Sequence, residues 1–331
     1  KWHLGGVRAE PFGFDLSLIW TNTNSHWDEG ICHPLGKDPV QPKGYGATRV
    51  TDQALEFIEQ NRKDPFFLMV SWTPPHADFL AAPEEKKHLY PDPTSLPFRG
   101  NVPSETKTIQ DGNRIWEKNS WEYYQGYHAH VSAIDDELKR VLEYIDQAGL
   151  IDNTLVVYSS DHGSMLGSHG LGSKRQPYEE SVRVPFLCWS PRRLPRGLKV
   201  PTLLGTVDIF PTLCGFANIT PPRICEGKDL SDAARGERIS PVHAQFIMHI
   251  DKTHASGGKQ HPAPIFRGVR TARYTYAAYP EGPWCLFDNR EDPLQINNLI
   301  DSPNHRTIKT RLHAEMKKLM RHACDPLTKT I

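Results

Sequence analysis

An apolar run that ends in Asp-His is the feature that most constrains the fold of this chain. Residues 154–160 read TLVVYSS, β-branched and apolar without alternation, which is typical of a strand covered on both faces of a mainly parallel sheet. Asp161 and His162 follow directly. They are therefore expected at the carboxyl end of the strand, where open α/β sheets bind ligands.

The residues around this strand end are suited to a cation and an anion together. A carboxylate and a neutral imidazole are competent ligands for a divalent cation, and the glycines of 163–170 let the backbone approach closely. Lys174 follows a few residues later, near enough to reach the same anion. The alternative is a surface turn that contains these residue types by chance.

A second strand pattern also ends in a histidine. Residues 65–72, PFFLMVSW, predict another buried strand, and Thr73-Pro-Pro leads from it to His76. The prolines fix the backbone and remove donors that a continuing strand would need. The alternative is a loop histidine whose hydrogen bonds are satisfied by its neighbours.

The first six residues, Lys1-Trp-His-Leu-Gly-Gly6, complete a set of three elements in a fixed order. With Lys-Trp-His, Pro-Pro-His and Ser-Asp-His-Gly followed by His-Gly and Lys, the chain resembles the sulfatases of the alkaline phosphatase superfamily. The segments DIFPTL at 208–213 and LFDNREDP at 286–293 resemble two further signatures of that family, so the likeness covers nearly the whole chain.

The resemblance implies an α/β fold with a mainly parallel central sheet flanked by helices, and a smaller C-terminal α+β subdomain of antiparallel sheet plus helix. It implies that Asp161 and His162 are two ligands of one divalent cation, Ca²⁺ or Mg²⁺. It also implies that Lys174 grips the sulfate oxygens.

The other matched positions concern the covalent chemistry. The resemblance makes His76 a general acid near the leaving oxygen, and it places Lys1 and His3 beside a formylglycine nucleophile. A sulfate ester departs with charge building on its bridging oxygen, so preorganised cations and a histidine that titrates near neutrality suit the reaction.

The nucleophile motif is missing from its family position. Cys-x-Pro-x-Arg does not occur in the chain: the near match at Cys32 has the Pro but no Arg, and the near match at Cys188 has its Pro one place late. The serine form, Ser95-Leu-Pro-Phe-Arg99, follows the elements that the family's nucleophile precedes, so we interpret it as a chance match. We therefore expect an N-terminally truncated chain, inactive by itself, with the nucleophile upstream. Ser168 is a smaller departure, since an acidic residue often precedes the motif histidine.

The composition limits the classes of molecule that the chain is expected to bind. The chain has 39 Lys and Arg against 39 Asp and Glu, so no basic field points to nucleic acid. No apolar run approaches the roughly 20 residues needed to span a bilayer. The six cysteines lack the spacing of a structural zinc site. The expected ligand is a small-molecule or saccharide sulfate ester, and the resemblance implies a periplasmic, secreted or lysosomal protein. Nothing in the sequence indicates an oligomeric state.

The chain is expected to form a main domain over 1–217, lacking its N-terminal part, and a C-terminal subdomain over 218–331. Apolar stripes predict helices over 50–58, 127–145 and 308–319, and further strands are expected over 184–189, 268–279 and 284–288. Asp208 is better explained as a helix cap than as a ligand. Irregular segments at 7–46, 77–113 and 240–265 are candidates for substrate selection. The histidines of the last segment, His243, His249, His254 and His261, are interpreted as solvated.

Three functions remain open on sequence alone. The first is hydrolysis of a sulfate ester. The second is hydrolysis of a phosphonate or phosphate ester, because relatives with the same fold and an Asp-His metal pair act on such substrates. The third is a catalytically inactive anion-binding homologue, which becomes favoured if the natural gene begins at Lys1.

Overall fold

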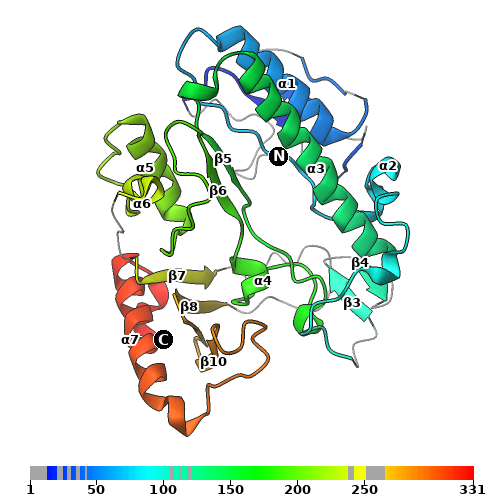
Figure 1. Cartoon of the computed structure of the whole chain (residues 1–331). Coiled ribbons are helices and arrows are strands. Elements are labelled where there is room, and N and C mark those ends of the chain that lie inside the picture. Colours follow the sequence, from blue (N-terminus) through cyan, green and yellow to red (C-terminus); the bar gives the residue numbers. More distant parts are fainter. Residues whose placement is uncertain are drawn as a thin grey trace. The chain divides into compact units, whose positions relative to one another are not determined.

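The computed structural model describes the chain except at residues 1–12, 21–24, 28–30, 35–37, 42, 105–107, 112–113, 118–120, 238–241 and 251–264. The chain divides into two compact units, Lys1–Pro97 with Asn119–Thr154 and Phe98–Lys118 with Leu155–Ile331. Figure 1 shows the elements of both. The domain boundary predicted at residue 217 does not coincide with this division and stays a prediction.

Two long helices form the framework of the first unit. Helix α1 (Gly46–Asn61) buries Ala47, Thr51, Ala54 and Ile58, a spacing of three to four residues that places them on one face. Helix α3 (Trp121–Gln147) packs along it, with Ala133 in a shared core beside Tyr45 and Ala47 (Figure 1). Both helices confirm the stripes found in the sequence. The remaining elements of this unit are β1 (Leu18–Trp20), β2 (Cys32–Pro34), η1 (Phe79–Ala81), α2 (Glu84–Lys87), η2 (Pro93–Ser95) and η3 (Ile151–Asn153).

The buried strand predicted over residues 65–72 is wrong in its details. These residues form no regular element, and their side chains alternate between half-buried and exposed. Phe67 and Met69 are 63% and 69% exposed. Period-two alternation is the pattern of a strand with one covered face, but among the described residues no neighbouring strand pairs with this segment.

The second unit contains the strand that carries Asp161. Strand β5 (Val156–Ser159) is confirmed, and it pairs with β6 (Phe186–Trp189). The pairing is antiparallel, and so is every other strand pair among the residues that the structure describes. The parallel pairing expected of β5 is therefore absent from the described part of the chain. Its residues are half-buried, with no side chain of the strand fully covered.

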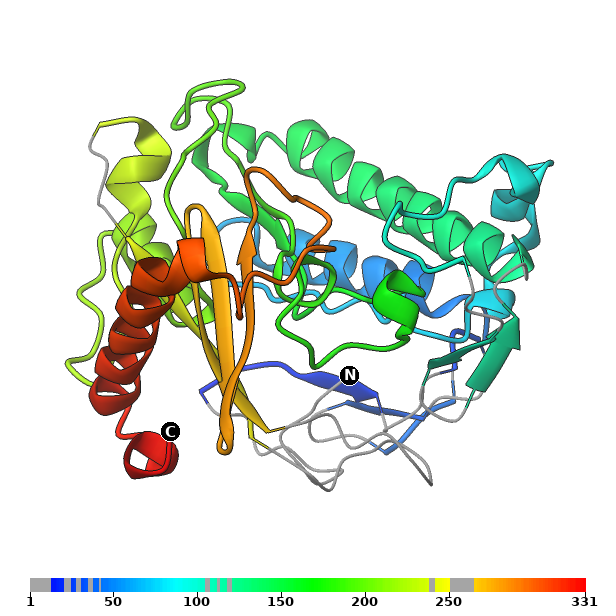
Figure 2. The ribbon, with the colours of Figure 1, turned by 90° about the horizontal axis from the view of Figure 1, so that it is seen from below.

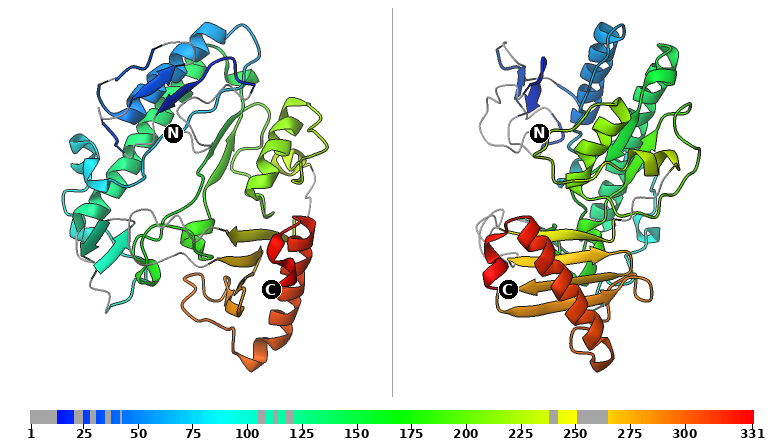
Figure 3. Two further views of the ribbon diagram at one scale, coloured as in Figure 1. Left: turned by 180° about the vertical axis from the view of Figure 1, so that it is seen from behind. Right: turned by 90° about the vertical axis from the view of Figure 1, so that its left-hand side faces the viewer.

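The C-terminal region confirms the predicted antiparallel sheet plus helix. The four strands follow the order β10-β9-β8-β7, and helix α7 (Arg306–His322) lies across one face, as Figures 2 and 3 show. The core between them includes Tyr276, Leu286 and Met316, each fully buried. The strands are β7 (Ala244–His249), β8 (Phe266–Thr271), β9 (Tyr274–Tyr279) and β10 (Gly282–Asp288).

Asp208 acts as a helix cap, as predicted. It lies in the first turn of α5 (Thr206–Ala217), where its Oδ2 accepts the amide proton of Gly205 at 2.8 Å and its Oδ1 accepts that of Lys228 at 2.8 Å. The remaining elements of this unit are β3 (Thr108–Asp111), β4 (Arg114–Glu117), η4 (Ser168–Gly170), α4 (Glu179–Val182), α6 (Ser231–Arg235), η5 (Pro303–His305) and η6 (Pro326–Lys329).

Two general properties of the described residues bear on function. No helix among them combines the length and apolar character that a membrane span requires. All six cysteines are free thiols. Of the loop histidines, His243 is exposed and His249 is half-buried at the end of β7, while His254 and His261 lie outside the described residues.

Candidate functional site

Asp161 and His162 lie directly beyond β5, as the sequence predicts, and they contact each other. Asp161 Oδ1 accepts the amide proton of His162 at 2.9 Å. Its other oxygen, Oδ2, lies 3.3 Å from Nε2 of His162. Ser160 fixes the turn, because its hydroxyl donates to the His162 carbonyl at 2.9 Å. The two polar groups thus face each other at the strand end.

The donor set of this pair fits a cation. His162 Nδ1 lies 2.9 Å from the carbonyl oxygen of Gly163. A carbonyl only accepts, so Nδ1 carries a proton and Nε2 is the ring nitrogen that faces Asp161 Oδ2. A carboxylate oxygen and an imidazole nitrogen at this distance share either a proton or a metal ion. Both are donor types that a divalent ion accepts.

The pair accounts for only part of a coordination sphere. Calcium takes about six to eight ligands and magnesium about six. In the part of the chain that the structure describes, no group of three or more His, Cys, Asp or Glu side chains is arranged to hold a metal. A metal ion held by Asp161 and His162 would therefore need further ligands.

The loop after His162 is fastened to the short helix α4. The amide of Gly163 donates to the Ser181 carbonyl at 3.0 Å. A Cβ at position 163 would lie 2.0 Å from the carbonyl oxygen of Glu180, so only glycine permits this approach. The Ser181 hydroxyl accepts the amide protons of Arg175 at 3.1 Å and of Gln176 at 3.4 Å. Ser181 thus anchors both ends of the loop, a role that no sequence pattern indicated.

Helix α4 is in turn supported by the C-terminal sheet. Arg270 on β8 makes a bidentate ion pair with Glu179, at 2.8 and 3.0 Å. The amide of Glu179 also donates to the Gln295 side chain at 2.8 Å. Both Glu179 and Gln295 are buried. The small sheet therefore stabilises the loop that carries the candidate site residues.

Lys174 stands between two residues in a left-handed conformation. The φ angles of Ser173 and Arg175 are 59° and 73°. Such angles are uncommon outside glycine and cost about 1–3 kcal/mol at each residue. They persist here because the Ser181 hydroxyl and the hydrogen bond from the Met165 amide to the Ser173 carbonyl hold the loop on both sides. Strain of this kind gathers at functional positions.

A buried polar cluster surrounds the motif histidine, His169. Its ring stacks on Tyr178, with centroids 3.9 Å apart, and its Nε2 lies 3.2 Å from the Asn101 amide nitrogen. Asn101 also donates to Glu180 at 2.8 Å, and Arg99 pairs with Glu180 at 3.0 Å. Burial lowers the pKa of His169, whereas the nearby carboxylate of Glu180 acts in the opposite direction.

This cluster explains the departure at Ser168. The carboxylate near His169 comes from Glu180 and not from the preceding residue, and Ser168 is buried. Asn101 lies far away in the sequence, so no local pattern points to it. Arg99, the last residue of the serine-type nucleophile match, is engaged with Glu180, and the Ser95 hydroxyl donates to the Asp92 carbonyl in a turn. Both contacts are structural, in keeping with a chance match.

His76 belongs to the first unit and lies in the turn after residues 65–72. Its amide donates to the Thr73 carbonyl at 3.1 Å. Its Nδ1 lies 2.7 Å from the carbonyl oxygen of Ala77, so Nδ1 carries the proton in this contact. The half-buried ring is thus oriented by its own backbone.

The structure brings together part of the predicted set. Asp161 and His162 are in contact, and Lys174 shares their loop. His76 is in the other unit, and Lys1 and His3 lie outside the described residues. That all six gather round one pocket stays a prediction.

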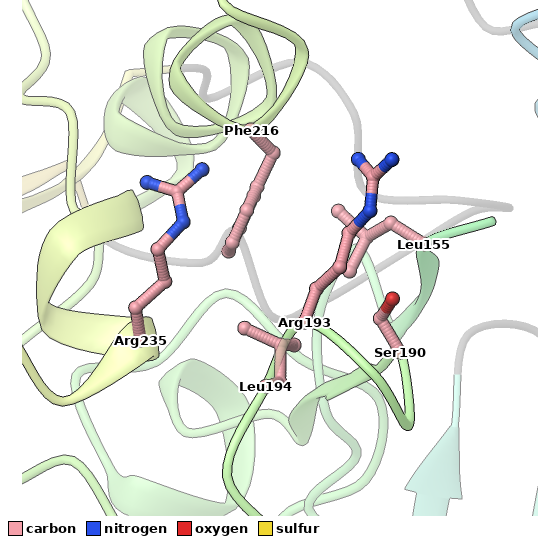
Figure 4. Close-up of a pocket in the computed structure, with 6 residues that line it drawn as sticks. All are labelled: Leu155, Ser190, Arg193, Leu194, Phe216 and Arg235. Carbon is pink, nitrogen blue, oxygen red and sulfur yellow. The ribbon is translucent and has the colours of Figure 1, made fainter. Parts of the chain in front are cut away.

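A small cavity in the second unit is lined by other residues. It has a volume of about 30 Å³ and is lined by Leu155, Ser190, Arg193, Leu194, Phe216 and Arg235 (Figure 4). The Arg235 guanidinium lies 5.0 Å from the centre of the Phe216 ring. A cavity of this size holds one or two waters and no sugar. It is therefore not a substrate site.

Comparison with known proteins identifies the family. The model of the family described as "Sulfatase" matches residues 1–219, and that described as "N-sulphoglucosamine sulphohydrolase, C-terminal" matches residues 167–322. The chain belongs to the sulfatase family. An ulvan-active sulfatase of Formosa agariphila is 33% identical over 98% of this chain and 63% of its own length. An endo-4-O-sulfatase of Bacteroides thetaiotaomicron is 31% identical over 98% of this chain and 66% of its own length.

Solved structures confirm the fold of this chain. One, from a study of the metabolism of multiple glycosaminoglycans by Bacteroides thetaiotaomicron, has a TM-score of 0.80 and 27% identity over 96% of this chain and 67% of its own. Another, in complex with its substrate D-glucosamine-2-N,6-O-disulfate, has a TM-score of 0.86 and 21% identity over 100% of this chain and 80% of its own. The alkaline phosphatase-like α/β fold predicted from the sequence is therefore confirmed. The chain spans slightly less than two thirds of the length of the curated relatives named above.

Proposed function

We propose that the protein to which this chain belongs is a sulfuric ester hydrolase that cleaves sulfate esters of saccharides at a divalent-metal site. The observation that carries the proposal is the contact between Asp161 Oδ2 and His162 Nε2 at 3.3 Å, a carboxylate and an imidazole that face each other at a strand end. Family membership supports a sulfate ester as the substrate class. A relative named N-acetylglucosamine-6-O-sulfatase, 26% identical, supports a saccharide as the group that carries it.

Each residue has a proposed role. Asp161 and His162 hold Ca²⁺ or Mg²⁺, which would stabilise the anionic sulfate oxygens. Lys174 binds the same oxygens as a fixed point charge, and the left-handed residues on either side of it keep its backbone in place. His76 protonates the leaving oxygen through Nε2. A well-placed cationic group of this kind lowers the barrier by about 2–4 kcal/mol, by analogy with oxyanion-hole donors.

The nucleophile is proposed to be a formylglycine from outside these 331 residues, because Cys-x-Pro-x-Arg does not occur among them. Lys1 and His3 are proposed to flank it. Mass spectrometry of the protein purified from its natural host would detect the aldehyde or its hydrate. An unmodified nucleophile would overturn this part of the proposal.

The test is a paired assay on the protein as its gene encodes it, including any residues that precede Lys1. Glucosamine 6-sulfate and 4-nitrophenyl sulfate are compared with the matching phosphate and phosphonate esters, before and after metal removal by chelation. We expect sulfate release that is lost on chelation and restored by Ca²⁺ or Mg²⁺. Asp161→Asn should abolish that restoration while the unfolding transition stays cooperative.

Two outcomes would replace the proposal. Preferential cleavage of phosphate or phosphonate esters favours the second hypothesis, to which a phosphonate monoester hydrolase of Agrobacterium radiobacter with a TM-score of 0.69 lends likeness of fold alone. Metal-dependent binding of sulfate without cleavage of any ester favours an inactive anion-binding protein. Elemental analysis of the purified protein distinguishes Ca²⁺ from Mg²⁺.

A further inference from the structure

Two buried histidines hold the backbone on either side of the His76 turn. His26 is 1% exposed, and its Nε2 lies 2.7 Å from the carbonyl oxygen of His76. His130 on α3 is fully buried, and its Nε2 lies 3.0 Å from the carbonyl oxygen of Asp78. The two imidazole rings are 4.3 Å apart, centre to centre. One pair of neighbouring rings thus binds two carbonyls of a single turn.

The hydrogen bonds determine the tautomer of His130. A carbonyl accepts, so Nε2 carries the proton that bonds Asp78. Nδ1 lies 2.7 Å from the Tyr45 hydroxyl, which therefore donates to the ring. Burial, together with the neighbouring His26, lowers the pKa of His130 to about 3. The ring is neutral over the working range of any hydrolase near neutral pH, and both of its nitrogens are satisfied.

Other contacts hold the next residues of the same turn. Trp27 Nε1 donates to the Ala81 carbonyl at 2.7 Å. Phe79 packs so close to α3 that a Cβ at Gly126 would lie 2.1 Å from its carbonyl oxygen. Gly126 lies one helical turn before His130 on α3. Residues 76–81 are therefore bound against α3 at several points.

Fixing these carbonyls fixes the ring of His76. The Ala77 carbonyl, which accepts the Nδ1 proton of His76 at 2.7 Å, lies between the two carbonyls held by His26 and His130. Rotation of the backbone at Ala77 would move that acceptor and turn the imidazole with it. The orientation of Nε2 of His76 therefore depends on the contacts that His26 and His130 make with this turn.

We propose that His26 and His130 are positioning residues that aim His76 Nε2 at the leaving oxygen. The inference rests on the proposed function, in which His76 protonates that oxygen. A displacement of a general acid by about 1 Å can cost on the order of 10²-fold in rate. The loss falls on esters whose leaving group needs protonation, because a good leaving group departs without it.

The test uses four variants of the protein as its gene encodes it. His130→Phe fills the space but removes both hydrogen bonds, and His130→Gln restores them, since its amide donates to Asp78 and its oxygen accepts from Tyr45. His128→Phe is the matched control, because His128 is half-buried on the same helix and contacts Tyr90 and Tyr127 by its ring. Values of kcat and KM are measured on 4-nitrophenyl sulfate and 4-methylphenyl sulfate, and His76→Ala is the reference for loss of the acid.

We expect His130→Phe to lower kcat by about 10- to 100-fold on 4-methylphenyl sulfate and far less on 4-nitrophenyl sulfate, with KM little changed. His130→Gln and His128→Phe should resemble the wild type. Hydrogen–deuterium exchange of residues 73–82, measured without substrate, should be faster in His130→Phe alone. Equal losses on both esters, or unchanged exchange, would overturn the positioning role.

The outcomes separate this inference from the proposed function. A wild-type protein that hydrolyses no sulfate ester counts against the function, whereas the exchange experiment still decides whether His130 holds the turn. A His76→Ala variant without leaving-group dependence removes the acid role of His76 and the positioning role with it. If the rate loss depends on the leaving group in His76→Ala but not in His130→Phe, the positioning role alone is overturned.

Discussion

Replacement of Gly163 by alanine tests the link between the loop backbone and the metal pair. The added Cβ would lie 2.0 Å from the Glu180 carbonyl oxygen and 3.0 Å from its carbon, whereas real Cβ atoms essentially never approach closer than 3.0 Å. The backbone must therefore move by about 1 Å, and overpacking of this kind costs about 1–3 kcal/mol of stability.

That movement acts directly on the candidate metal ligands. The Gly163 carbonyl accepts the Nδ1 proton of His162 and so holds the ring whose other nitrogen faces Asp161. Loss of an outer-shell partner lowers metal affinity by about 10- to 100-fold. We expect Gly163→Ala to weaken Ca²⁺ or Mg²⁺ binding by that factor, measured by isothermal titration on the protein as its gene encodes it.

The control is Gly197→Ala. Gly197 has a φ of 68° and no atom within 4 Å of an added Cβ, so alanine there incurs strain of about 1–2 kcal/mol without a clash. It should lower the free energy of unfolding and leave metal affinity unchanged. Wild-type metal affinity in Gly163→Ala would refute the reasoning, because the pair would then be independent of the backbone that orients it.

Three further predictions follow from other contacts. Lys174→Ala should lower kcat by about 10²- to 10³-fold, from the loss of one preorganised cationic group, while urea unfolding stays unchanged, and wild-type turnover would remove Lys174 from the mechanism. Asp325→Ala removes the carboxylate that lies 2.6 Å from the Arg267 side chain, which is only 3% exposed, so urea unfolding should show a free energy of unfolding lower by about 3–5 kcal/mol. The control is Lys318→Ala at an exposed ion pair, which should lower it by less than about 0.5 kcal/mol. Folding lowers the pKa of His130 to about 3, so below about pH 6.5 the unfolded chain binds a proton that the folded chain does not bind. This group should therefore lower the free energy of unfolding by about 1.4 kcal/mol for each unit that the pH falls. In unfolding experiments between pH 6.5 and 4.5, His130→Gln should show a shallower decline than the wild type.

Local patterns in the sequence predicted the helices and the strand end correctly. The stripes at 50–58 and 127–145 became α1 and α3, and TLVVYSS became β5 with Asp161 and His162 directly after it. Asp208 was identified as a cap from its place in the first turn of a helix. These features depend on residues close together in the chain, so periodicity and composition are sufficient to find them.

Pairing and support depend on residues far apart, and these the sequence did not reveal. The segment 65–72 was predicted as a buried strand, yet its alternate side chains are exposed. Ser181, Asn101 and His130 carry no local signal, because each acts on a backbone or a ring that the chain reaches only after folding.

The sequence by itself determined which groups are available for chemistry: a carboxylate and an imidazole after one strand, a lysine in the next loop, and a histidine after two prolines. Only the tertiary structure decided how they are held, with Ser181 and Arg270 supporting the loop of Lys174, and His26 and His130 supporting the turn of His76. The physical reason is that ligand type is a property of a side chain, whereas orientation requires hydrogen bonds from segments that only folding brings near.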